Sequence, residues 1–196
     1  MYFQPEVDLQ LDVSGLDASV ITTARVLEHI SPFKDAINIY TDGARSTSGR
    51  AASAFRIQLY DVTVALRLID HCTAYAAELT AIYICIQWIN TDDRSYFVIF
   101  SDTIGSLKSI RETSTTGRPR LLIDVLERQH DLHVNKQKRV QFVWIPAHIN
   151  IVGHDAADRA AKYKLSSPEV ELNVGIEQPE ARSVIKEHVT SLWQSE

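Results

Sequence analysis

The sequence predicts an α/β fold in which a mixed sheet of five strands is flanked by helices. Three β-type segments follow one another between residues 37 and 69, and the later segments alternate between helix and strand patterns. Short connections first and helical crossovers later are typical of a sheet that is antiparallel in one half and parallel in the other. The chain has 196 residues, 45% of them apolar and 23% charged, which is enough for one domain with a sizeable core.

The three antiparallel strands come first along the chain. Ile37 to Thr41 alternate in polarity and lead into Asp42-Gly43, where the glycine predicts a turn. Residues 52–60 and 62–69 are rich in β-forming side chains and are joined at Asp61 by a connection short enough for a hairpin. These segments predict a three-stranded meander.

The parallel half of the sheet is predicted from residue 73 onward. Thr73 is a suitable N-cap for a largely buried helix that ends near Asn90. The apolar run 96–101 ends at Asp102 and indicates a central strand covered on both faces. The remaining elements are predicted as helices over 103–111 and 120–135, a strand over 139–145 and a helix over 154–165.

Two terminal segments flank this unit, which spans residues 35–166. Residues 1–34 are predicted to be a leader or linker with one helix from Asp17 to Ile30, and residues 167–196 a linker followed by an amphipathic helix over 180–193. No apolar run approaches the length of about 18 residues needed to span a bilayer, and no secretory signal is recognisable, so no membrane partner is expected. The two cysteines suit a reducing compartment, which favours an intracellular location, in the cytoplasm or the nucleus.

Acidic side chains occupy notable positions in these predicted elements. Asp42 and Asp102 follow two strands that would end at the same sheet edge if they are parallel neighbours, and Glu78 lies in the helix that would cover that edge. Asp158, near the start of the last helix, would complete the group. Oxygen-only ligands favour Mg²⁺ or Mn²⁺, and bound cations would reverse the local charge. Leaving these four acids out changes the net charge from −5 to −1, so the rest of the chain is nearly neutral.

Each of these residues also has an ordinary structural explanation. An Asp before Gly is common in turns, a helical Glu is usually exposed, and an Asp near a helix start is favoured by the helix dipole. His148 lies in a loop after Pro146, where a chemical role is one explanation among several. His154 is interpreted as a residue of the helix start rather than as a ligand.

Five segments in this order and spacing resemble the ribonuclease H domain, and more narrowly the domain found in polyproteins of non-LTR (LINE-type) retrotransposons. The resemblance covers residues 35–166. It is carried by Ile39-Tyr40-Thr41-Asp42-Gly43-Ala44, Thr73-Ala74-Tyr75-Ala76-Ala77-Glu78-Leu79, Phe100-Ser101-Asp102-Thr103, Trp144-Ile145-Pro146-Ala147-His148 and Ala157-Asp158-Arg159-Ala160-Ala161-Lys162.

The resemblance implies a ribonuclease H-like fold and metal-dependent cleavage of the RNA strand of RNA/DNA hybrids, leaving 5′-phosphate and 3′-hydroxyl ends. By position, it assigns two Mg²⁺ ions, for which Mn²⁺ can substitute, to Asp42, Glu78, Asp102 and Asp158. His148 would assist proton transfer or product departure, and Thr73 would lie near a phosphate of the DNA strand. The resemblance also suggests a reverse transcriptase domain in the same polyprotein as a partner, and it leaves the oligomeric state open.

The sequence departs from the family's pattern at several places. Positions that often carry polar groups for hybrid binding are Ala74, Tyr75 and Ile104, and the usual Gly-Asn-Glu before the last Asp is Gly153-His154-Asp155. The main alternative is therefore a domesticated or decayed, non-catalytic module of the same fold, which would bind nucleic acid or act in assembly. A DEDD-type exonuclease fits less well because Ala44 stands where that family has Glu, and an α/β domain without catalysis is the remaining alternative.

Overall fold

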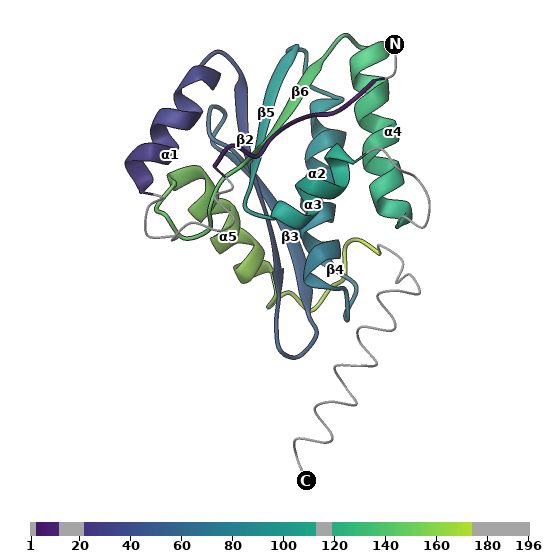
Figure 1. Ribbon diagram of the computed structural model, residues 1–196. Coiled ribbons are helices and arrows are strands. Elements are labelled where there is room, and N and C mark those ends of the chain that lie inside the picture. The colour runs from purple at the N-terminus through teal and green to yellow at the C-terminus, as the bar shows by residue number, and fades with distance from the viewer. Residues whose placement is uncertain (1–2, 12–21, 113–118, 174–196) are drawn as a thin grey trace.

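A computed structural model describes residues 3–11, 22–112 and 119–173 of the chain (Figure 1). Six strands form one mixed sheet in the order β1-β6-β5-β2-β3-β4. The elements of the described part are β1 (Glu6–Asp8), α1 (Thr23–Ile30), a 3₁₀ turn η2 (Ser31–Phe33), β2 (Ile37–Arg45), β3 (Ala51–Ile57), β4 (Val62–Leu68), α2 (Ala74–Ile89), β5 (Tyr96–Ser101), α3 (Ile104–Arg111), α4 (Arg120–Val134), β6 (Arg139–Trp144) and α5 (Val152–Lys164).

The predicted division of the sheet into an antiparallel and a parallel half is confirmed. β2, β3 and β4 are antiparallel neighbours, and β3 and β4 are joined by a tight turn at Asp61, whose φ is 55°. β5 pairs with β2 in parallel, and β6 pairs with β5 in parallel. The mixed α/β architecture is that of the ribonuclease H-like fold.

The sheet has one more strand than the five that the sequence predicts. Residues Glu6–Asp8, within the predicted leader, form β1 and pair in parallel with β6 at the edge of the sheet. An ion pair of 2.7 Å between Arg139 and Glu6 links the two strands. Three residues are too few to show an alternating pattern in a sequence, so this strand depends on its partner β6.

The predicted turn at Gly43 is wrong, because β2 continues through Asp42 and Gly43 to Arg45. A Cβ atom built on Gly43 would lie 2.4 Å from the backbone nitrogen of Glu78. The glycine is therefore needed for the close approach of α2 to β2. The described glycine with a positive φ is Gly49, at 86°, in the connection between β2 and β3.

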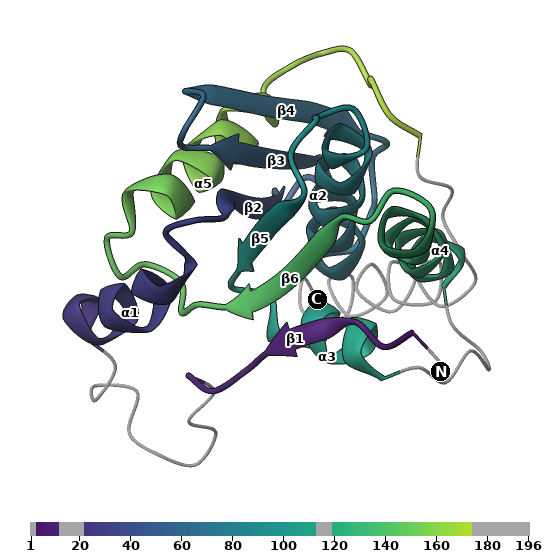
Figure 2. The same ribbon diagram turned by 90° about the horizontal axis from the view of Figure 1, so that it is seen from above.

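Helices cover both faces of the sheet (Figure 2). α2, α3 and α4 enclose the larger core on one face, and α1 and α5 enclose a smaller core on the other. The strand residues divide by parity: Phe97 and Ile99 of β5 contribute to the larger core, while Val98 and Phe100 contribute to the smaller one. The sheet is thus buried on both sides around β5, as the continuous apolar run predicts.

The prediction of α2 is confirmed nearly to the residue. The Thr73 side chain accepts a hydrogen bond of 3.1 Å from the backbone N–H of Ala76, which is the N-cap contact. Ten residues of the helix are buried, so α2 packs along most of its circumference. α5 begins at Val152, two residues before the predicted start.

Two predicted helices fall partly or wholly outside the described residues. Of the helix predicted over 17–30, the structure describes α1 from Thr23, with Thr22 as its N-cap, and residues 17–21 lie outside the described part. The helix predicted over 180–193 also lies outside it.

Leu172 forms a bridge to Leu68 at the end of β4. None of the helices in the described ranges has the length and apolar character required to cross a membrane.

Candidate functional site

Asp42 and Asp102 lie together because β2 and β5 are parallel neighbours in matched register. Tyr40 is the partner of Phe100 across the two strands, and each acid follows two residues later. The Thr41 hydroxyl donates a hydrogen bond of 3.4 Å to the Phe100 carbonyl and continues the link. The condition that these strands are parallel neighbours is thereby confirmed, but the predicted strand end at Asp42 is wrong, because β2 continues through Asp42 to Arg45.

Glu78 is carried to this edge by α2. The missing side chain of Gly43 lets the helix backbone approach β2, and the Ser53 hydroxyl of β3 donates a hydrogen bond of 2.6 Å to the Ala77 carbonyl. Oε2 of Glu78 is buried and has no hydrogen-bond partner among the described residues. Glu78 is therefore not the exposed helical residue of the ordinary explanation.

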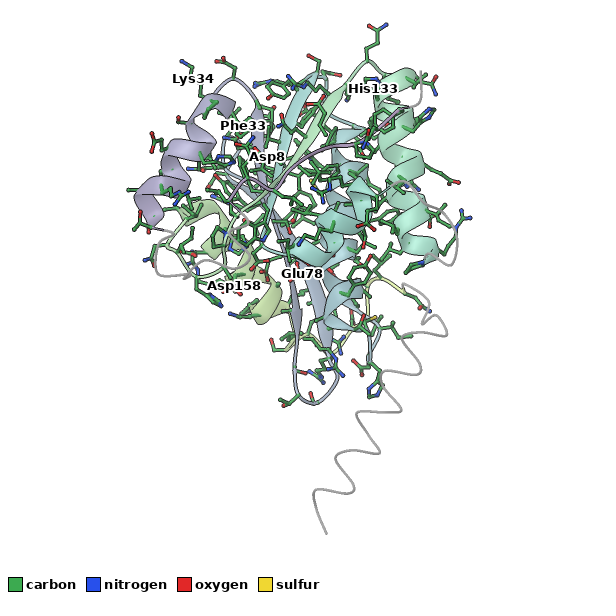
Figure 3. The ribbon with its side chains drawn as sticks, in the orientation of Figure 1. Asp8, Phe33, Lys34, Glu78, His133 and Asp158 are labelled. Carbon is green, nitrogen blue, oxygen red and sulfur yellow. The ribbon has the colours of Figure 1, made fainter. Side chains whose placement is uncertain are left out.

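Asp158 reaches the site from α5, on the opposite face of the sheet from Glu78 (Figure 3). Both Glu78 and Asp42 interact electrostatically with Asp158, so the four predicted acids share one region. Glu78 and Asp158 are not part of the tighter group formed by Asp42, Asp102 and His154, whose ligand atoms lie within 4.8 Å of one another. Lys162, one turn later, forms an ion pair of 2.7 Å with Asp158. The interaction with Asp158 raises the pKa of Lys162.

The four acids lie close enough to perturb one another. Burial, reinforced by the charges of Asp102 and Asp158, raises the pKa of Asp42 to about 7. Burial and the charges of Asp42 and Asp102 raise the pKa of Glu78 to about 9, although a hydrogen bond from the backbone of Gly43 opposes the shift. Without a counter-ion, the site therefore holds protons that an ordinary carboxyl group releases.

His154 is a member of this group that the sequence interpretation missed. Its side chain is buried, and Nε2 lies 3.6 Å from Oδ2 of Asp102 and 4.0 Å from Oδ1 of Asp42. Burial acts to lower the pKa of His154, but the interactions with Asp102 and Asp42 outweigh it and raise the pKa. His154 and Asp158 are four residues apart, which places both on one face of α5. This spacing was the feature of the sequence that could have assigned His154 to the site.

Gly153 explains how α5 comes so close to the strands. A Cβ atom at this position would lie 2.3 Å from the ring of Tyr40, which itself stacks on Phe100. The glycine lets the first turn of α5 lie directly on β2 and so directs His154 towards the acids. The packing contact determines the position of His154, and it is not visible in the sequence.

The two other predicted site residues, Thr73 and His148, lie at a helix start and on a loop. Thr73 is half-buried at the N-terminus of α2, where its hydroxyl caps the helix. His148 is exposed on the loop between β6 and α5, with a left-handed φ of 58°. Neither belongs to the group of possible ligands formed by Asp42, Asp102 and His154.

The donors in this group suit a divalent cation. Asp42, Asp102 and His154 each present a ligand atom, and these atoms lie within 4.8 Å of one another. Two buried polar atoms of the site, Oε2 of Glu78 and Nε2 of His154, have no hydrogen-bond partner among the described residues. A bound cation would both satisfy such atoms and relieve the mutual repulsion of the carboxylates.

Comparison with known proteins agrees with the fold and the site. The family profile described as RNase H matches residues 34–166. Ribonuclease H1 of Mus musculus is 24% identical over 146 residues, which cover 65% of this chain and 50% of the mouse protein. Ribonuclease H1 of Rattus norvegicus gives the same identity and coverage, so the chain spans half the length of these relatives. Since the matched profile covers well over half of the chain, the protein belongs to the ribonuclease H family, which depends on divalent metals and acts on RNA/DNA hybrids.

Proposed function

We propose that the chain is a metal-dependent endonuclease that hydrolyses the RNA strand of RNA/DNA hybrids. The observation that supports the proposal is the close group of Asp42, Asp102 and His154, together with the electrostatic influence of Glu78 and Asp158, which come from helices on opposite faces of the sheet. Membership of the ribonuclease H family supports the choice of substrate.

In this proposal the four acids hold two divalent cations, Mg²⁺ or Mn²⁺. Such cations supply an activated water and stabilise the leaving oxygen of the phosphodiester when they are bound. His148 lies on an exposed loop and, in this proposal, would assist proton transfer or product departure. Thr73, at the start of α2, would lie near a phosphate of the DNA strand.

Recognition of the hybrid would depend on shape rather than on sequence. The 2′-hydroxyl groups and the shallow minor groove distinguish RNA from DNA without contacts to particular bases. We therefore expect cleavage of hybrids of different sequence, with 5′-phosphate and 3′-hydroxyl ends.

Cleavage of an end-labelled hybrid tests the proposal directly. The full chain with Mg²⁺ or Mn²⁺ should cut the RNA strand, whereas RNA/RNA and DNA/DNA duplexes of the same sequence should stay intact. Asp42→Asn should reduce the rate by ~10³-fold, equivalent to about 4 kcal/mol of transition-state stabilisation. Asp93→Asn, at an exposed position before β5, is the matched control and should cleave at the wild-type rate. Equal rates in the two variants would refute the assignment.

A second candidate function is a non-catalytic module of the same fold. It is favoured by the start of α2, where Ala74 is exposed and the ring of Tyr75 packs against the larger core, leaving fewer polar groups for a hybrid. Titration with Mg²⁺ or Mn²⁺ separates the two candidates. A functional site should stabilise the folded chain by about 2.7 kcal/mol at a cation concentration of 100 times Kd, measured as a rise in Tm. An unchanged Tm would favour the non-catalytic module.

The narrower origin from a non-LTR retrotransposon is also part of the proposal. Its support is the pair of segments that begin at Tyr75 and at Trp144, which resemble that branch of the family. A reverse transcriptase domain would then be the partner that presents the hybrid. Sequencing of the surrounding locus tests this, since an adjoining reverse transcriptase reading frame is expected, and a locus without one would contradict it.

A further inference from the structure

His154 is the one histidine side chain that the structure places in a group of possible metal-binding residues within the described ranges. It is 3% exposed, and its Nε2 atom makes no hydrogen bond among the residues that the structure describes, although it lies within ion-pair distance of the carboxylates of Asp102 and Asp42. A buried polar nitrogen is ordinarily paired, because burial removes the water that would otherwise solvate it. The nitrogen points into the acidic group, where a ligand could satisfy it.

Packing contacts of the first turns of α5 fix the position of His154. Gly153 packs against the ring of Tyr40, and Ala157 is fully buried in the smaller core. The backbone N–H of Asp155 donates a hydrogen bond of 2.8 Å to the carbonyl of Ile151 and fixes the first turn. The imidazole is therefore preorganised beside Asp42 and Asp102.

The distances agree with coordination of a single cation. Nε2 lies 3.6 Å from Oδ2 of Asp102 and 4.0 Å from Oδ1 of Asp42. In an octahedral site with bonds of about 2.1 Å, neighbouring ligand atoms are about 3 Å apart and opposite ones about 4 Å apart. Small side-chain rotations would bring all three atoms to bonding distance of one ion.

The chemistry of the nitrogen distinguishes this site from one made of oxygen ligands. Carboxylates suit Mg²⁺ and Mn²⁺, whereas an imidazole binds the transition metals more strongly than it binds Mg²⁺. The sequence pattern alone predicts oxygen ligands, and His154 stands where the resembled pattern has Asn. A histidine in place of asparagine offers the site a ring nitrogen instead of an amide group, and this changes the cation that the site prefers.

We propose that Nε2 of His154 is a direct ligand of a divalent cation held between Asp42 and Asp102, and that it gives the site a preference for Mn²⁺ over Mg²⁺. This inference rests on the proposed metal-dependent function and adds a nitrogen ligand to its four acids. It also predicts which variant converts the site to one with oxygen ligands, namely His154→Asn.

Pulsed electron paramagnetic resonance of the full chain loaded with one equivalent of Mn²⁺ tests the ligand. The wild type should show electron spin echo modulation from a directly bound nitrogen, and His154→Asn should lose it. His130→Asn, which removes an exposed histidine of α4, is the matched control and should retain it. A wild-type spectrum without nitrogen modulation, or modulation that survives in His154→Asn, would overturn the proposal.

Calorimetric titration gives the second measurement. His154→Asn should weaken Mn²⁺ binding by at least about tenfold, the lower end of the losses seen when even indirect partners of a metal are removed. Mg²⁺ binding should change less, so that the ratio of the two affinities falls. An unchanged ratio in a variant with a wild-type circular dichroism spectrum would overturn the proposal. If His154→Asn unfolds, His154→Gln is the replacement, with the same expected loss.

The outcomes separate this inference from the proposed function. A chain that cleaves hybrids and binds Mn²⁺ without a nitrogen ligand would contradict only the role of His154. A chain that binds Mn²⁺ through His154 and does not cleave hybrids would contradict only the nuclease function. A chain that binds neither cation would contradict both.

Discussion

The two helices that complete the site, α2 and α5, differ in how they hold their acidic residue. α2 is buried along most of its length, and Oε2 of Glu78 is buried without a hydrogen-bond partner among the described residues. α5 is buried at four described positions and carries Asp158 beside solvent, where Lys162 pairs with it. The carboxyl group of Glu78 is therefore desolvated, whereas that of Asp158 is partly hydrated and paired with the ammonium group of Lys162.

The largest expected difference between the helices lies in catalysis. Glu78→Gln should reduce hybrid cleavage by ~10³-fold, because no water can replace a buried ligand, whereas Asp158→Asn should reduce it by about 10- to 100-fold. Single-turnover rates at saturating Mn²⁺ measure both. A larger loss of cleavage in Asp158→Asn than in Glu78→Gln would show that water does not replace Asp158 more easily than it replaces Glu78.

The packing of α2 on β2 gives the next largest effect. Gly43→Ala places a methyl group 2.4 Å from the backbone of Glu78 and should destabilise the fold by about 3 kcal/mol, the upper end of overpacking costs. Gly105→Ala in α3 is the matched control, since a Cβ there meets nothing within 4 Å and should raise the stability by up to about 1 kcal/mol. Urea denaturation measures both. Equal stabilities would show that α2 does not depend on Gly43.

Desolvation of Glu78 should appear in the pH dependence of stability. Its pKa is raised from 4.5 to about 9, so in the metal-free protein the folded state binds a proton that the unfolded state releases between these values. The free energy of unfolding should therefore fall as the pH rises, by on the order of 2 kcal/mol between about pH 6 and pH 8. Glu78→Gln should remove most of this fall. If the free energy of unfolding fell equally steeply with pH in the wild type and in Glu78→Gln, the assignment of this pH dependence to Glu78 would be wrong.

The smallest effect is expected on the solvent-facing side of α5. Lys162 is more than half exposed, and its ion pair with Asp158 spans one helical turn. Lys162→Met should therefore lower the stability by only about 0.3–0.5 kcal/mol at low salt, and less at high salt. Thermal denaturation at two salt concentrations measures this. A loss above 1 kcal/mol would show that the pair behaves as a buried one.

The sequence predicts the site better where it depends on local pattern than where it depends on packing. The cap at Thr73 and the apolar surface that follows it predict α2, and the apolar run before Asp102 predicts β5, because both signals are contained within one element. The meeting of Asp42 with Asp102 follows from the order of strands. The roles of Gly43 and His154 were missed, since each depends on the approach of a helix to β2.

The same reasoning explains why β1 was missed while the longer strands were found. A strand of three residues gains its hydrogen bonds from β6 and its position from the ion pair of Glu6 with Arg139. Its own residues contain no periodic signal. The conformation of such a short edge strand depends on the sheet with which it pairs rather than on its own residues.

The presence of β1 has a practical consequence for work with shortened chains. Removal of residues 1–10, which include β1 but not α1, would leave one side of β6 with unpaired backbone N–H and carbonyl groups. An unpaired strand edge readily pairs with a strand of another molecule. The shortened protein should therefore self-associate at lower concentrations than the longer chain. The N-terminal segment would then act as a guard against aggregation, independently of any part it plays in catalysis.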